Sequence, residues 1–157
     1  MKVLICLLAL LLLALHSGNA SGETEPFAEA IKRVPQAEAG RINPMLRAAQ
    51  GGGDITQDAL CIGFLARTSG LIQEAWAAAK QNPPQMVQIM TELSTLLLAD
   101  VSMRLDESNL ELFSSALNNG QAVAEPSSGD AVEVAGALAD SSHWRHALAV
   151  ACAARAE

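Results

Sequence analysis

The chain has 157 residues, of which 50% are hydrophobic, 3% aromatic and 17% charged, and its formal net charge is −7. That apolar content excludes an intrinsically disordered protein, and an acidic chain with so few aromatic residues is not expected to bind nucleic acid. The length suits a single domain built around one hydrophobic core.

The N-terminus has the pattern of a secretory signal peptide. Lys2 precedes an unbroken apolar run over residues 3–15, and small residues occupy the −3 and −1 positions of a cut after Ala20. A helix over this run is about 20 Å long, shorter than the roughly 30 Å core of a bilayer, which disfavours a transmembrane anchor. We expect removal of residues 1–20 on export to the periplasm or the extracellular space, which leaves residues 21–157 as a single domain without stable membrane insertion.

The two cysteines that remain after removal of the leader are Cys61 and Cys152, because Cys6 leaves with it. Disulfides persist in exported compartments, so these two residues are predicted to pair and to tie the middle of the chain to its C-terminal helix. The alternative is a pair of buried thiols that act as small apolar side chains. Their wide spacing excludes a CxxC redox motif and a four-cysteine zinc site.

Hydrophobic periodicity predicts an all-α protein, a compact bundle of about five to six helices with one disulfide and no sheet. In the first half, the expected helical segments are residues 24–34, a turn or two after Asn43, and residues 54–79. The third of these segments has the strongest pattern and starts at a capping box, Asp54 with Gln57. Ser69-Gly70 is the place where it is expected to bend or break.

In the second half, the expected helix starts are Pro84, Ser108, Asp130, and Ser141 or Ser142. The first of these helices is predicted to run to about Leu105, with near-complete burial of its Leu96–Leu98 stretch. The second is predicted to end at Gly120, before a loop over residues 120–130.

Acidic residues are concentrated in this second half. Residues 82–140 contain nine acids and one base, Arg104, whereas residues 21–81 contain seven acids and six bases. Such an imbalance is explained by solubility and by acidic residues at helix starts, and it also suits binding to a basic partner, because complementary charge steers association.

The sequence has no constellation typical of an enzyme. It contains neither a GxSxG motif nor a phosphate-binding GK[ST] motif, so we expect no enzymatic activity and no cofactor. The most enzyme-like group is Glu92, Asp100 and Arg104, and the last two are spaced as an ordinary i, i+4 ion pair.

His143 and His146 are the nearest approach to metal ligands, with Asp140 one turn before them. Three ligands on one helix rarely converge on one ion, so a metal site is not predicted. We expect surface histidines instead, one of which packs beside Trp144.

Binding remains once catalysis is set aside. We expect an exported helical domain that engages another protein, basic in charge, through its acidic half, by analogy with periplasmic immunity and inhibitor proteins. The candidate contacts are Glu92, Asp106, Glu107, Glu111, Glu125 and the 120–130 segment. Two alternatives stay open: a structural component of an envelope assembly, or a carrier of a small apolar ligand lined by Met86, Met90, Met103, Phe64 and Phe113.

Overall fold

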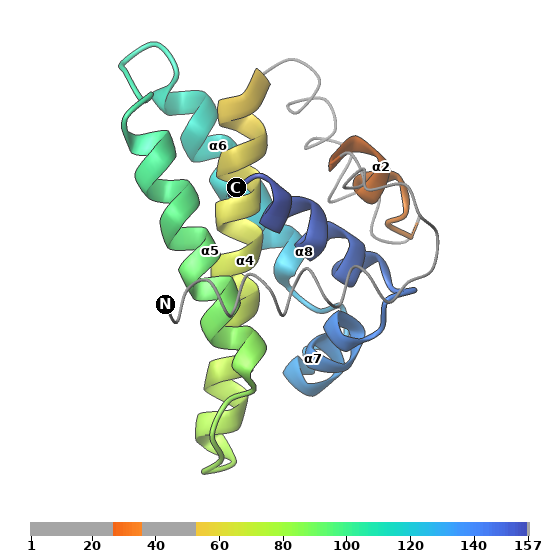
Figure 1. Cartoon of the computed structure of the whole chain (residues 1–157). Coiled ribbons are helices and arrows are strands. Elements are labelled where there is room, and N and C mark those ends of the chain that lie inside the picture. Colours follow the sequence, from red (N-terminus) through yellow and green to blue (C-terminus); the bar gives the residue numbers. More distant parts are fainter. Residues whose placement is uncertain (1–26, 36–52, 157) are drawn as a thin grey trace.

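A computed structural model of the chain describes residues 27–35 and 53–156 (Figure 1). Its helices are α2 (Phe27–Lys32), α4 (Gly53–Ala78), α5 (Gln85–Ser102), α6 (Leu110–Ala124), α7 (Ala131–Ala139) and α8 (Trp144–Ala154). The described residues include no strand, and the predicted all-α class is confirmed. None of these helices is long and apolar enough to cross a membrane. The predicted signal peptide and the predicted turns after Asn43 lie outside the described residues.

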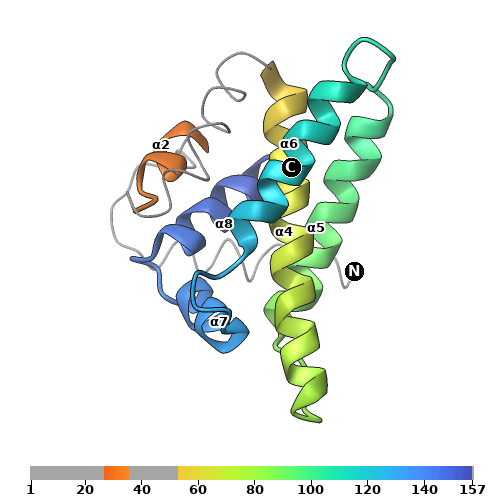
Figure 2. The same ribbon diagram turned by 180° about the vertical axis from the view of Figure 1, so that it is seen from behind.

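The central element is α4, against which α5, α6, α7 and α8 all pack. Its side chains supply much of the core, including Leu60, Phe64, Leu65 and Ile72. Its C-terminal end and the start of α5 extend as a hairpin beyond the other helices (Figures 1 and 2). Of the two outcomes expected at Ser69-Gly70, a bend or a break, the break does not occur, because the helix is continuous through both residues. The Ser69 hydroxyl donates to the Ala66 carbonyl within the helix, 2.9 Å away.

Two glycines allow α4 and α6 to cross at close range. A Cβ atom on Gly63 would lie 2.2 Å from the carbonyl oxygen of Leu117, and one on Gly120 would lie 2.1 Å from that of Leu60. Real Cβ atoms do not approach so closely, so the crossing requires glycine on both helices. Gly120 therefore lies inside α6, which continues to Ala124. The prediction that Gly120 ends this helix and begins a long loop is wrong.

The helix caps follow the predictions only in part. Asp130 is the N-cap of α7, as expected, and its carboxylate accepts a hydrogen bond of 2.8 Å from the backbone N–H of Val132. Asp54 lies within the first turn of α4 and does not cap it, because the helix begins at Gly53. Ser108 is replaced as the N-cap of α6 by Asn109, whose side chain makes no capping bond.

The last helix is capped by His143 rather than by Ser141 or Ser142. The Nδ1 atom of His143 accepts a hydrogen bond of 3.1 Å from the backbone N–H of Arg145. The buried Arg145 side chain in turn donates to the carbonyl oxygens of Ala124 and Glu125, which end α6. Arg145 therefore fastens the start of α8 to the end of α6.

The predicted disulfide is confirmed and fastens the other end of α8. Cys61 of α4 and Cys152 of α8 have their Sγ atoms 2.07 Å apart and their Cα atoms 5.3 Å apart. Both residues are fully buried. The opposite side of α8 receives α2, whose Phe27 is buried in the same core.

Candidate functional site

Large apolar side chains are exposed along the C-terminal half of α5. Leu96 and Leu98 are 51% and 45% exposed, and Met103, just after the helix, is 80% exposed. Leu97 is buried against the core, because successive residues of a helix point about 100° apart and one of three neighbours can face α4. The prediction that Leu96–Leu98 is almost completely buried is therefore wrong.

The start of α6 continues this exposure with Leu110 and Leu112, each about half exposed. Among the described residues, five of the six exposed large hydrophobic side chains fall between Leu96 and Leu112, and the sixth is Val132 of α7. Exposed apolar side chains gathered on one part of a protein are typical of an interaction surface. We call residues 92–112 the acidic–apolar segment, for its exposed carboxylates as well as these side chains.

One side of α5 alternates carboxylates and apolar side chains. Glu92, Leu96, Asp100 and Met103 follow one another at steps of four, four and three residues, which places them in a single stripe along the helix. All four are exposed. Leu98 points about 200° away from Leu96 and lies outside this stripe.

Three more carboxylates follow along the chain, Asp106 and Glu107 in the turn between α5 and α6 and Glu111 in the first turn of α6. Asp106 accepts hydrogen bonds from the hydroxyl and backbone N–H of Ser108 and from the N–H of Asn109. These hydrogen bonds lower the pKa of Asp106 and keep its carboxylate ionised, and the bond from the Ser108 hydroxyl has the largest effect. Glu107 and Glu111 are exposed beside it. The segment therefore carries negative charge from end to end.

Arg104, the one base among residues 82–140, already faces two carboxylates. Its Nη2 atom donates to Oδ2 of the buried Asp58 at 2.6 Å and also to the carboxylate of Asp100. The hydrogen bond to Asp58 is the main cause of a raised pKa of Arg104. Within the described part of the chain, no ion pair joins a base to the remaining carboxylates of the segment, Glu92, Asp106, Glu107 and Glu111.

Glu125 lies at the opposite end of α6 from the candidate contacts Asp106, Glu107 and Glu111. This residue follows the last residue of α6, and the 15 residues of that helix place it about 20 Å from the α5–α6 turn. Its carboxylate accepts a hydrogen bond from Nε of Arg67, which raises the pKa of Arg67. Glu125 thus serves the contact between α4 and the end of α6. Glu92, which lies in the stripe, accepts a hydrogen bond of 2.8 Å from Gln88, whereas Asp100 accepts one from Arg104.

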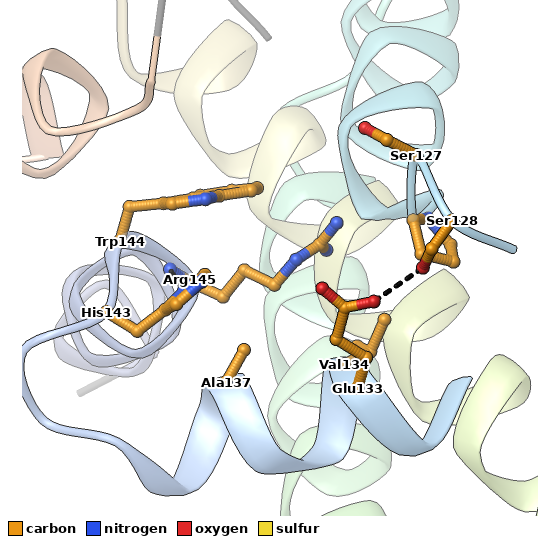
Figure 3. Close-up of a pocket in the computed structure, with 9 residues that line it drawn as sticks. Ser127, Ser128, Glu133, Val134, Ala137, His143, Trp144 and Arg145 are labelled. Carbon is orange, nitrogen blue, oxygen red and sulfur yellow. Dashed lines mark hydrogen bonds between the residues drawn. The ribbon is translucent and has the colours of Figure 1, made fainter. Parts of the chain in front are cut away.

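A pocket of about 250 Å³ lies between α7, α8 and the turn after α6 (Figure 3). Glu133 and Arg145 reach into it from different helices, and Glu133 accepts a hydrogen bond of 2.6 Å from the Ser128 hydroxyl. The Arg145 guanidinium carbon lies 4.5 Å from the ring centroid of Trp144. Glu133 and Arg145 thus each contact another residue that lines this pocket.

Neither histidine of α8 is arranged as a metal ligand with its neighbours. His146 Nδ1 is 2.7 Å from the carbonyl oxygen of Leu138 and must donate to it, and His143 lies beside Trp144, as expected. The carboxylate of Asp140 accepts hydrogen bonds from Ser142, which lower its pKa. In the described ranges, no three His, Cys, Asp or Glu side chains form a group able to hold a metal ion.

Asp58 and Arg155 form an ion pair that was not predicted from the sequence. Arg155 Nε donates to Asp58 Oδ1 at 2.6 Å, and its Nη1 atom donates to Gln57. The sequence did indicate that Asp58 is buried, because it stands three residues after Ile55 and four before Ile62, on the apolar stripe of α4. A carboxylate at a buried position requires a partner.

No protein-family model, curated protein or solved structure matches this chain. Function must therefore be inferred from the chemistry of the molecule itself. The described surface offers one concentrated feature, the acidic–apolar segment.

Proposed function

We propose that this protein is an exported helical binding domain that engages a basic protein partner through the acidic–apolar segment. The observation that carries the proposal is the coincidence, on one stretch of chain, of exposed large apolar side chains and carboxylates that face no base within the described residues. The apolar leader predicted over residues 1–20 supports export, and the Cys61–Cys152 disulfide agrees with an oxidising compartment.

The two kinds of side chain have different roles in such an interface. Carboxylates such as Glu107 and Glu111 attract a basic surface and accelerate its association, an effect that salt weakens. Apolar side chains such as Leu96 and Met103 lose water on contact and slow dissociation. An immunity or inhibitor protein, which must find and hold a target enzyme, uses both effects.

Affinity capture of the tagged full-length chain from its own cells tests the proposal. We expect one protein to be retained at about 0.15 M salt and released as the salt concentration rises. The double variant Glu107→Lys/Glu111→Lys should lose this protein. A matched charge reversal on α4, Glu74→Lys, should retain it, because Glu74 is also exposed but lies on another helix. A captured protein that neither salt nor the double variant releases would contradict the proposal.

The carrier alternative gains no support from the residues on which it rested. Met103 is exposed, whereas Phe64, Met90 and Phe113 are buried side chains of the packed core. Retention of a small apolar molecule in native mass spectrometry would restore this alternative. Membership of an envelope assembly stays a prediction, which co-purification with a membrane complex would support.

A further inference from the structure

We infer that the segment recognises a basic amphipathic α-helix, which docks lengthwise along the α5 stripe formed by Glu92, Leu96, Asp100 and Met103. This inference rests on the proposed function and adds to it the chemistry and secondary structure of the partner. Apolar side chains of the partner helix would cover Leu96 and Met103. Its lysines or arginines would face Glu92 and Asp100 and the carboxylates of the following turn.

The spacing of the stripe favours a helix. Leu96 and Met103 are seven residues apart, about 10 Å along the axis of α5, which is also the separation of residues i and i+7 on a partner helix. An extended peptide usually binds by adding to the edge of a sheet, and the described residues offer no strand. Proline-rich segments bind to aromatic-lined surfaces, and the stripe contains no aromatic residue. The apolar face of a partner helix is the mode of recognition that suits leucine and methionine side chains at helical spacing.

The charge of the stripe selects among the possible occupants. A second copy of this chain, related by a two-fold axis, would bring the stripe of one copy against the stripe of the other, so that acidic residues would face acidic residues, and like charges repel. An anionic membrane surface is disfavoured for the same reason. Arg104 is paired with Asp100 and shares Asp58 with Arg155, so it adds no free positive charge to the stripe. A cationic partner is therefore complementary to Glu92 and to Asp106, Glu107 and Glu111, which face no base within the described residues.

A synthetic peptide of about five helical turns, with leucines on one face and lysines beside them, is the probe. We expect the protein, purified as its cells produce it, to bind this peptide. The helicity of the peptide, measured by circular dichroism, should rise on binding. A peptide of the same composition with its order scrambled should bind about tenfold more weakly, since it has no apolar face. Equal binding of the two peptides would show charge attraction alone and would overturn the inference.

Two matched substitutions locate the binding site. Leu96→Ser should weaken binding of the leucine–lysine peptide about tenfold, whereas Val132→Ser on α7, outside the acidic–apolar segment, should leave it unchanged. Leu96 and Val132 are 51% and 59% exposed, so a loss of folded protein would affect both variants alike. Chemical-shift mapping on the unmodified protein gives an independent result and should show the largest changes at Glu92, Leu96 and Asp100. Equal losses in both variants, or shifts centred on another helix, would overturn the inference.

The captured partner separates this inference from the proposed function. If Glu107→Lys/Glu111→Lys releases the partner but Leu96→Ser does not, the proposed function stands and docking on the stripe is wrong. If no partner depends on either change, the proposed function itself fails. Concentration-dependent dimers that Leu96→Ser abolishes would identify a second copy as the occupant, and binding to phosphatidylglycerol vesicles would identify a membrane. Either result would overturn the inference.

Discussion

Asp58 and Arg155 are hydrogen-bonded one helical turn away from the Cys61–Cys152 disulfide. Arg155 Nε lies 2.6 Å from Asp58 Oδ1, and each residue of this pair stands three positions from one of the cysteines. The ion pair and the disulfide are therefore neighbouring links between α4 and the C-terminal end of α8. Asp58 precedes Cys61 whereas Arg155 follows Cys152, so the two helices run in opposite directions at this contact. The second oxygen of Asp58 accepts from Arg104, so the same carboxylate also holds the end of α5.

Loss of the Asp58 charge should destabilise the fold. The side chain is 6% exposed and is held by two guanidinium groups, which Asp58→Asn would leave facing a neutral amide. We expect the free energy of unfolding, measured with urea, to fall by about 2–3 kcal/mol, below the usual range for a fully buried pair because both arginines are partly exposed. Asp54→Asn is the control. Asp54 is 81% exposed and 3.6 Å from Arg155, so its loss should cost less than about 0.5 kcal/mol.

The disulfide and the Asp58–Arg155 bond should be coupled. Replacement of both cysteines by serine should lower the free energy of unfolding by about 3–5 kcal/mol, because the 91-residue separation closes a long loop in the unfolded chain. Each link by itself should keep α8 docked on α4. With both removed, we expect hydrogen exchange of the α8 amides to rise well above the sum of the two single effects. Additive changes would show that the two links act independently.

Alanine substitutions at two glycines of α4 should have opposite effects. Gly63→Ala would drive a methyl group into the backbone of α6, and we expect a loss of about 3 kcal/mol or more, or failure to fold. Gly70 has open space around its Cα atom and lies within the same helix, so Gly70→Ala should raise stability by about 0.5–1 kcal/mol. Thermal unfolding of both variants measures the difference. A tolerated Gly63→Ala would contradict the close crossing of α4 and α6.

Asp106 should contribute to stability in a defined pH range. Its folded pKa is lowered from the ordinary value of 3.8, so its stabilising effect is complete above that value and is lost as the pH falls through the lower folded pKa. Asp106→Asn keeps an oxygen that can accept the hydrogen bonds and removes the charge. We therefore expect a shallower decline of stability below about pH 4 in this variant, and an unchanged slope above about pH 5.

Glu107→Gln is the matched control for this titration. It removes a charge from the next residue without touching the bonds that Ser108 and Asn109 make to Asp106. Unfolding midpoints from pH 2 to pH 7 should then follow the unmodified protein more closely than those of Asp106→Asn do. If stability declined identically below about pH 4 in all three proteins, Asp106 would not contribute to the pH dependence of stability.

Features that depend on neighbours within one or two turns could be predicted from the sequence. The helical period over residues 54–79 predicted α4 because the apolar residues repeat at the spacing of one helix face. Asp130 was predicted as a cap because its carboxylate acts on a backbone N–H two residues away. The pairing of Cys61 with Cys152 followed from their being the two cysteines that remain after the predicted leader.

Tertiary structure alone decided which apolar side chains became surface and which polar ones became core. Leu96 and Leu97 are adjacent leucines in the same apolar run, yet Leu96 faces solvent and Leu97 faces α4. The hydrophobic period of a helix does not tell on which side its partner helix packs. Gly120 has the sequence pattern of a helix end, but it lies inside α6 where this helix crosses α4. The crossing brings Gly120 against the backbone of Leu60, which is distant in the sequence. The candidate binding surface exists for the same reason: α5 packs against α4 on one face, and no described helix covers the stripe on its flank.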